Sequence, residues 1–426
     1  TRYFSRGADE DGNVSNFAET EQIVELESAP LKGGVLSHVQ IRGSVPIDWY
    51  QNINLKYIPT LLINIEQSTD RFFRHFDRVI KDYRNVYAVN LVNKAKYEKP
   101  IGDQFTRLSR EYANSQRGDE KGAESGRLYY THFDFHKECS KMRWHRISLL
   151  IDEISGKLEE FGYYYQDPKG DVIHHQTGVI RTNCMDCLDR TNVVQSVVAR
   201  FILTAQFREL EVLSSNETFD MFPQLEGMMR NIWADNADAV SCAYSGTGAL
   251  KTDFTRTGKR TKIGAIQDGR NSIERYIRGN FLDGVRQDAM DLFLGKAQVV
   301  YGSDPFKRQL SLQCKMLLAC LVVSLLMVVI GVIYAPFGYF TLKSTAFVVS
   351  WEGVTYLVAR EVMKSHAAEV LNWPSLVPYP YRPQAVHVGE GLKVPIIGHY
   401  LENGLGAAST AADSTLTSQS SKPKRA

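Results

Sequence analysis

The sequence predicts an α/β domain followed by a C-terminal transmembrane helical hairpin. Within the first 300 residues, the short apolar runs 57–65 and 86–92 have the length and composition of buried strands. Strands that alternate with amphipathic helices favour an α/β domain. Apolar residues recur at helical spacing in three stretches: 71–83, 143–161 and 192–210.

The hairpin is predicted from residues 316–359. The run 316–335 contains 20 residues without a charge, which is about the length needed to cross a ~30 Å hydrocarbon core. The second run, 337–359, is weaker because it contains Lys343 and Glu352, whose burial is costly. Basic residues flank both runs, so we expect both ends of the hairpin in the cytoplasm. If the second run does not span, the C-terminal tail is lumenal.

Composition excludes several classes of protein. The chain has 426 residues, 43% of them hydrophobic, with 50 basic and 48 acidic side chains and a formal net charge of +2. This length allows two or three folding units. The hydrophobic fraction is too high for a mainly disordered chain. Six cysteines are too few for a disulfide framework. The balanced charge argues against a nucleic-acid partner.

The most informative motif is the segment 178–192, GVIRTNCMDCLDRTN, in which a short strand leads through a turn into a helix. Five residues separate Cys184 from Arg190, and Thr191 follows. A strand–loop–helix of this kind can surround a phosphate with backbone N–H groups and the positive end of a helix dipole. The same field favours a thiolate at Cys184. Arg190 supplies two parallel donors to phosphoryl oxygens, and Thr191 can donate to the thiolate.

This chemistry predicts a two-step hydrolysis of a phosphate ester without a metal or other cofactor. Cys184 attacks phosphorus, an acid protonates the leaving alkoxide, and water then cleaves the phosphocysteine. Asp186 is the first candidate for the acid, with Asp189 and His136 behind it. The remaining predicted contacts to substrate within this loop are Met185, Cys187, Leu188, Asp189 and Thr191.

Other interpretations of the motif fit less well. Cys184 and Cys187 form a Cys-x-x-Cys pair, which is typical of redox and zinc sites. Zinc requires four ligands, and the sequence has no second Cys pair or well-spaced Cys/His pair. A thioredoxin-type site would not explain Arg190. An ordinary strand-to-helix turn remains compatible with the Cys-x5-Arg spacing alone.

The complete string RTNCMDCLDRTN resembles, almost letter for letter, the signature RxNCxDCLDRTN of the Sac-domain phosphoinositide phosphatases. The resemblance extends over roughly residues 1–300. Further matching blocks are NFAETEQ (16–22), QIRGSVPI (40–47), FDFH (133–136), WADNAD (233–238), YSGTGALK (244–251) and NFLDGVRQD (280–288).

The resemblance implies that Cys184 is the nucleophile, Arg190 the phosphate clamp and Asp186 the acid. It also implies a largely β N-terminal domain before the catalytic domain, so the region 1–300 is expected to be an N-terminally truncated catalytic region. Residues 301–315 then form a basic juxtamembrane linker, 316–359 the hairpin, and 360–426 a partly disordered tail. With its hairpin, the chain is similar to the membrane-anchored members of the endoplasmic reticulum and Golgi. These members hydrolyse phosphatidylinositol 4-phosphate, and we include the 3-phosphate as a second substrate.

A basic cluster and the C-terminus suggest further partners. Residues 251–262 contain five basic side chains and one acidic side chain, Asp253. Such a cluster can hold an anionic headgroup or the cytoplasmic leaflet, or it is simply a solvated loop. Two lysines near the C-terminus, at the third and fifth positions from the end, resemble a dilysine signal read by coat or retrieval machinery. The cluster residues predicted to bind substrate are Lys251, Arg256, Lys259 and Arg260.

Together these patterns predict a multi-pass phosphoinositide phosphatase of the endoplasmic reticulum and Golgi membrane, with its catalytic domain in the cytosol. Its predicted partners are a phosphoinositide lipid and the bilayer, with no nucleic acid. The loop chemistry does not identify the leaving group, so a phosphoprotein phosphatase is the alternative enzyme. A catalytically idle membrane tether or scaffold is the alternative from another class.

Overall fold

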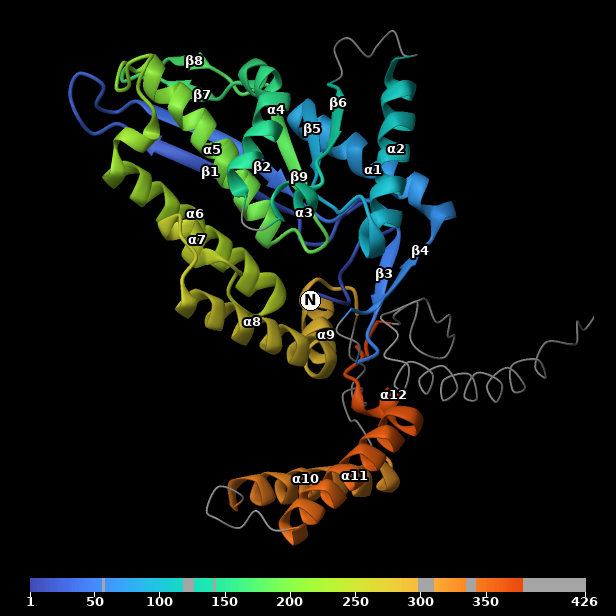
Figure 1. Ribbon diagram of the computed structural model, residues 1–426. Helices are drawn as coiled ribbons and strands as arrows, with labels where there is room; N and C mark the ends of the chain where they lie inside the picture. Colours follow the sequence, from blue (N-terminus) through green and yellow to red (C-terminus); the bar gives the residue numbers. More distant parts are fainter. Residues whose placement is uncertain (56–57, 118–125, 141–142, 298–309, 335–341, 378–426) are drawn as a thin grey trace, which may run out of the picture.

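The structure, a computed structural model, describes residues 1–55, 58–117, 126–140, 143–297, 310–334 and 342–377 (Figure 1). Its centre is a seven-stranded mixed sheet in the order β6-β5-β9-β2-β7-β8, with β1 paired to β2. The strands are β1 (Ala18–Glu25), β2 (Val35–Arg42), β5 (Asn85–Asn90), β6 (Leu128–His132), β7 (Tyr164–Gln166), β8 (Val172–His174) and β9 (Gly178–Asn183).

Four neighbouring strands, β6, β5, β9 and β2, are parallel and form the middle of the sheet. In the register of β5 with β9, Asn90 lies opposite Asn183. Both strands therefore end at the same edge of the sheet. The segment that begins at Cys184 and the segment that begins at Leu91 consequently leave the sheet side by side, and this adjacency positions the site described below.

Helices cover both faces of the sheet. The alternation of side chains along β5 shows this directly, because Val86 and Ala88 belong to one hydrophobic core and Tyr87 and Val89 to the other. The first core includes residues of α1 (Ile65–Tyr83) and α2 (Lys99–Arg117), and the second includes residues of α4 (Ser148–Phe161) and α5 (Asp189–Glu209). The short helices nearby are η1 (Lys96–Glu98), α3 (Phe135–Glu138) and η4 (Trp144–Ile147).

The predicted alternation of strands and helices is thus confirmed, with one difference. The run 57–65 does not contribute to the central sheet. Its strand, β4 (Thr60–Ile63), pairs with β3 (Trp49–Asn52) in a separate two-stranded sheet. Apolar composition indicates that a strand is buried, but it does not specify which sheet the strand joins.

A layer of helices follows α5 and lies against the edge of the sheet that carries the site (Figure 1). In this layer α6 packs on α5, α7 on α6, α8 on α7 and α9 on α8. The residue bounds are η5 (Phe219–Met221), α6 (Pro223–Ser245), α7 (Thr252–Thr257), α8 (Lys262–Phe281) and α9 (Asp283–Phe293).

Two long helices, α10 (Leu312–Tyr334) and α11 (Leu342–Ser365), lie side by side below the α/β domain, and α12 (Ala367–Val370) follows (Figure 1). Within the described residues one helix, Leu312–Ile333, is long and apolar enough to cross a membrane. It starts four residues before the predicted run 316–335. The second predicted run falls partly on α11, which does not pass the same test, and residues 337–341 lie outside the described ranges.

The chain returns to the α/β domain after α12. Leu371 and Trp373 are buried against Tyr3, Phe4 and Ile53. The predicted tail is described only as far as residue 377, so the low-complexity stretch and the terminal lysines lie outside the described residues, as do residues 301–309 of the predicted linker.

Candidate active site

The loop 184–188 joins the carboxyl end of β9 to the first turn of α5, at the edge of the sheet where β5 also ends. Cys187 adopts a left-handed conformation in this loop, with φ of 52°. Its sulfur lies 2.8 Å from the Gly43 carbonyl oxygen, so this strained residue lies against the end of β2. Cys184 is 3% exposed.

Cys184 has the acidity expected of a nucleophile. Its pKa is lowered from 9.0 to about 6, and the largest cause is a hydrogen bond from the Cys187 thiol. The charge of Arg190 and a hydrogen bond from the Thr191 hydroxyl (Oγ1 to Sγ 3.6 Å) lower it further, against the opposing effect of burial. Burial raises the pKa of Cys187 well above its usual value, so that thiol keeps its proton and remains a donor. Cys184 is therefore largely a thiolate at neutral pH.

Arg190 lies across from the loop, held by the segment that follows β5. Its Nη1 and Nη2 atoms donate to the two carboxylate oxygens of Glu98 at 2.8 and 2.7 Å. Nη1 also donates to the Leu91 carbonyl at 3.0 Å and to Asn93 Oδ1 at 3.2 Å. The guanidinium is thus held in place, and the Glu98 carboxylate occupies its planar edge.

Asp186, the first candidate for the acid, is held between two arginines of the N-terminal segment. Its carboxylate pairs with Arg2 at 3.0 Å and with Arg6 at 2.5 Å. Burial opposes ionisation, but the charges of Arg2 and Arg6 outweigh it and hold the pKa of Asp186 well below its usual range. In this arrangement Asp186 is a carboxylate without a proton to donate. A role as the acid requires that at least one of these arginines be drawn away.

The other two candidate acids line a second cavity, which Arg190 also lines. Asp189 accepts hydrogen bonds from the Leu250 amide at 2.6 Å and from Arg275 Nη1 at 3.1 Å. His136 is exposed on the short helix α3. It lines the same cavity as Asp189 and Arg190.

Two cavities meet at Arg190 and Glu98. One cavity, of about 270 Å³, is lined by Asp186 in addition to these two residues. The other cavity, of about 460 Å³, is lined by His136 and Lys251 in addition to these two residues. The structure therefore presents two approaches to the arginine, each with its own candidate acid. Other lining residues of the first cavity are Arg2, Tyr3, Tyr97, Met185, Arg275 and Tyr276.

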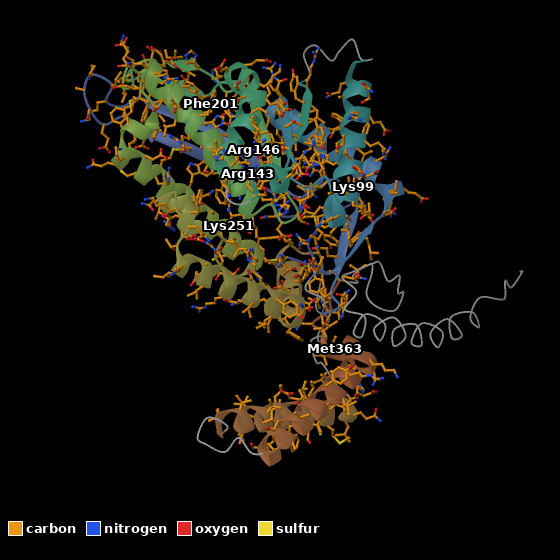
Figure 2. All side chains as sticks on the ribbon, viewed as in Figure 1. Lys99, Arg143, Arg146, Phe201, Lys251 and Met363 are labelled. Atoms are coloured by element: carbon orange, nitrogen blue, oxygen red, sulfur yellow. The ribbon has the colours of Figure 1, made fainter. Side chains whose placement is uncertain are left out.

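The predicted basic cluster is divided by the fold. Lys251 lines the larger cavity, with its ammonium 5.7 Å from the centre of the Trp144 ring, and Figure 2 shows it near Arg143 and Arg146, which flank that ring in the chain. Arg256 instead pairs with Asp235 at 2.7 Å and Asp238 at 3.3 Å in α6. Arg260 pairs with Asp253 and Asp268, and Lys259 is exposed. Much of the cluster's charge is thus neutralised within the helical layer.

Several residues of the site were not anticipated from the sequence. Arg6 donates to the Met185 carbonyl at 3.2 Å and Asn16 to the Asp186 carbonyl at 2.8 Å, so the N-terminal segment supports the loop backbone. Arg275 lies almost fully buried and bridges Asp189 to the Thr247 hydroxyl at 2.9 Å. Asn16 and Thr247 belong to blocks that matched the Sac signature, whereas nothing in the local spacing marks Arg6.

The residues that could bind a metal ion lie outside the loop 184–188. Within the described residues one group has ligand atoms close enough to hold an ion, all within 4.8 Å of one another: Cys314, His366 and Glu369. These residues belong to the start of α10 and to the segment after α11, away from the catalytic loop (Figure 1). Glu369 is already used there, because it accepts hydrogen bonds from His366 at 2.8 Å and from the Ser311 amide at 2.9 Å.

A buried cysteine of low pKa between a parallel strand and a helix, with an arginine six residues later, is typical of cysteine-dependent phosphatases. Residues 1–140 match the family model described as the SacI homology domain. The chain therefore carries a SacI homology domain, and over most of its length it is homologous to SAC1-type phosphoinositide phosphatases.

Three similar proteins show how far this homology extends along the sequence. The chain is 42% identical over 389 residues to "Phosphatidylinositol-3-phosphatase SAC1" of Saccharomyces cerevisiae, covering 88% of this chain and 60% of that protein. It is 41% identical over 379 residues to "Phosphatidylinositol-3-phosphatase SAC1-A" of Danio rerio (88% and 61%). It is 36% identical over 383 residues to "Phosphoinositide phosphatase SAC6" of Arabidopsis thaliana (88% and 61%). The chain spans about 60% of the length of these relatives.

Proposed function

We propose that this chain hydrolyses the phosphate monoester of a phosphatidylinositol monophosphate through a phosphocysteine intermediate. The observation that carries the proposal is the Cys184 thiol, whose pKa of about 6 makes it a nucleophile beside Arg190 at neutral pH. The Sac-type relatives support an inositol lipid as the substrate. We propose phosphatidylinositol 4-phosphate as the main substrate because of the sequence resemblance. The names of two relatives support the 3-phosphate as a second substrate.

In the first step the Cys184 thiolate attacks phosphorus, forming an S–P bond and breaking the bond to the inositol oxygen. Negative charge accumulates on the phosphoryl oxygens, and the planar guanidinium of Arg190 can donate to two of them at once. The Glu98 carboxylate holds this edge before substrate binds. Exchange of Glu98 for phosphate replaces one anion by another, so the arginine keeps a negatively charged acceptor throughout.

The leaving alkoxide needs a proton, and the two cavities offer different donors. A phosphate in the smaller cavity places a second anion beside Arg2 and Arg6, which weakens their hold on Asp186 and raises its pKa toward a useful range. A substrate in the larger cavity would instead meet His136 and Asp189. We propose Asp186 as the acid on the first approach, with His136 as the alternative on the second.

In the second step a water molecule attacks the phosphocysteine, forming a P–O bond and releasing the Cys184 thiolate. The group that gave its proton in the first step accepts one from this water. The Thr191 hydroxyl, 3.6 Å from the sulfur, stabilises the departing thiolate by a hydrogen bond. The cycle returns the chain to its starting protonation state and requires no redox partner.

We further propose the domain arrangement predicted from the sequence: a catalytic region over 1–300, a linker over 301–315, a hairpin over 316–359 and a tail over 360–426. The apolar helix Leu312–Ile333 supports a membrane anchor. We propose that α11 returns the chain across the membrane, so that both ends lie in the cytosol. An endoplasmic reticulum and Golgi location, with recognition by coat or retrieval machinery, belongs to the same proposal. Protease protection of the two flanks in sealed microsomes tests the topology, and a protected tail would contradict it.

The central experiment compares substrates on the detergent-solubilised chain. We expect turnover of phosphatidylinositol monophosphates to be lost in Cys184→Ser and retained in Cys242→Ser, whose exposed thiol lies on α6 away from the loop. Turnover that persists in Cys184→Ser would contradict the mechanism. Equal or faster turnover of a phosphotyrosine peptide would favour the phosphoprotein phosphatase, and no turnover of either substrate would favour a tether or scaffold.

A further inference from the structure

Helix α8 has its polar and apolar faces reversed with respect to the protein interior. Ile263, Ile266 and Ile273 are 81%, 74% and 63% exposed, and Ile277 is 46% exposed. The buried side chains of α8 are instead polar, as with Asn271 and Arg275. A surface helix ordinarily turns its apolar face to the core. The sequence of α8 therefore indicates an apolar environment outside the domain.

The exposed isoleucines form one stripe. At about 100° per residue they fall within a sector of about 80°, and Arg275 lies on the opposite side of the helix. Ile266, Ile273 and Ile277, with Leu282 just beyond the helix, line a shallow open groove. Four exposed isoleucines on one side of a helix are unusual on the surface of a soluble domain. We refer to Ile263, Ile266, Ile273 and Ile277 as the isoleucine face.

The same helix forms part of the wall of the smaller cavity. Ser272, Arg275 and Tyr276 of α8 line that cavity together with Asp186 and Arg190. Tyr276 lies about 60° around the helix from Ile273, so the cavity wall and the isoleucine face are neighbouring strips of one cylinder. Whatever covers the isoleucine face is thereby brought close to the cavity.

Charges beside the isoleucine face are mostly basic. Lys259 and Lys262 lie before the helix and in its first turn, and Arg270 lies within the stripe; all three are exposed. No carboxylate of the described residues lies within ion-pair distance of them, whereas the acidic residues of α8 are used internally. Glu274 pairs with Arg278 at 2.8 Å, and Asp268 pairs with Arg260 at 2.6 Å.

We propose that the isoleucine face docks on the surface of a bilayer that contains anionic lipids, so that the smaller cavity opens toward the headgroups. An amphipathic helix in the membrane interface buries its apolar side about 5–10 Å into the headgroup and acyl boundary, and basic residues beside it attract anionic lipid. The inference rests on the proposed function, because the substrate is a lipid of that bilayer. The exposed basic side chains favour a bilayer over a second copy or another segment of a longer chain.

A kinetic experiment on the full chain tests the docking. The chain is reconstituted in vesicles of phosphatidylcholine, phosphatidylserine and phosphatidylinositol 4-phosphate, and a water-soluble dibutanoyl analogue is assayed in parallel. We expect Ile266→Asp/Ile273→Asp to lower kcat/KM on vesicles about tenfold and to leave it unchanged on the soluble analogue. The matched control is Val172→Asp/Ile173→Asp, exposed on β8 at the far end of the domain, and it should retain both activities (Figure 1).

Wild-type rates of the variant on both substrates would overturn the docking. An equal loss on both would overturn it too, because it would show that the isoleucine face supports the fold and not contact with a membrane. A photocrosslinker at position 273 provides a readout independent of activity. In the same vesicles Ile273→p-benzoylphenylalanine should give lipid adducts, and crosslinks to a second copy or within the chain without lipid adducts would overturn the proposal. If the wild type hydrolyses neither substrate but forms lipid adducts, the proposed function fails and the docking stands.

Discussion

Helices α5 and α8 are of similar length, and both contribute to the smaller cavity, yet they bury opposite kinds of side chain. Helix α5 turns Val194, Val198 and Ile202 into the core beneath the sheet. Helix α8 turns polar groups inward, among them Arg275, and leaves its isoleucines outside. The first helix is fixed by packing and carries the proposed phosphate-binding Arg190 in its first turn. The second is fixed by hydrogen bonds and ion pairs, which frees its apolar side for an external surface.

The largest expected effect lies at the start of α5. Arg190→Lys keeps the positive charge but loses the two parallel donors, and we expect kcat to fall about 10²–10³-fold. Steady-state kinetics on a phosphatidylinositol monophosphate measure this loss. Arg200→Lys, farther along α5, is the matched control and should retain activity. Activity of Arg190→Lys near the wild-type value would show that α5 contributes a point charge rather than a bidentate clamp.

The next effect tests the polar interior of α8. Arg275→Met removes a buried guanidinium that bonds Asp189, Thr247, Ser241 and the Gly248 carbonyl. Breaking such a network leaves polar partners unpaired, and we expect a loss of about 2–4 kcal/mol in the free energy of unfolding. Denaturant unfolding in detergent measures it. An unchanged midpoint would mean that α8 is held by its apolar contacts after all.

The sequence predicted the region around α5 better than the region around α8, for a physical reason. The strand β9, the turn and the helix are specified by neighbouring residues, so the sequence predicted the strand before Cys184 and the helix after it. The predicted helix 192–210 differs from α5 (Asp189–Glu209) by three residues at its start. The periodicity of a helix reports an apolar side but not the direction in which that side faces.

Electrostatic partners were harder to predict than secondary structure. Arg2 and Arg6 reach Asp186 across about 180 positions of the chain, and Glu98 reaches Arg190 across 92. No local pattern records such pairs, because they depend on the order of strands in the sheet. For the same reason the basic cluster looked uncompensated in sequence, although acids of α6 and α8 neutralise Arg256 and Arg260.

A pair of truncations compares the apolar sides of the two helices directly. Val198→Ala in α5 removes two methyl groups from a fully buried site, and we expect it to cost about 1–2 kcal/mol of the free energy of unfolding. Ile277→Ala in α8 removes exposed apolar surface and should change stability by less than about 0.5 kcal/mol. Parallel unfolding curves in detergent measure both changes. Equal costs would show that the isoleucine face is packed against protein.

The smallest effect concerns the pH dependence that the loop 184–188 and the first turn of α5 impose on Cys184. The pKa of this thiol is lowered to about 6, so the reactive thiolate forms as pH rises through that value. We therefore expect kcat/KM to rise from pH 5 and to level off above pH 7 on the acid limb of the profile. Cys187→Ala removes the largest lowering contribution and should move this limb to higher pH.

Thr191→Val tests the weaker contribution and should move the acid limb in the same direction by a smaller amount, because the Thr191 hydroxyl is the lesser of the two donors to the sulfur. Thr191→Ser, which keeps the hydroxyl, is the matched control and should keep the wild-type limb. Rates of iodoacetamide labelling of Cys184 across the same pH range follow the thiolate without substrate, which separates it from the unidentified acid. A limb that moves in the kinetic profile but not in the labelling rates would assign that limb to the acid instead of to Cys184. In that case the first turn of α5 would position the leaving group's proton donor, and the polar groups that α8 buries around Asp189 would take part in the chemistry as well as in the fold.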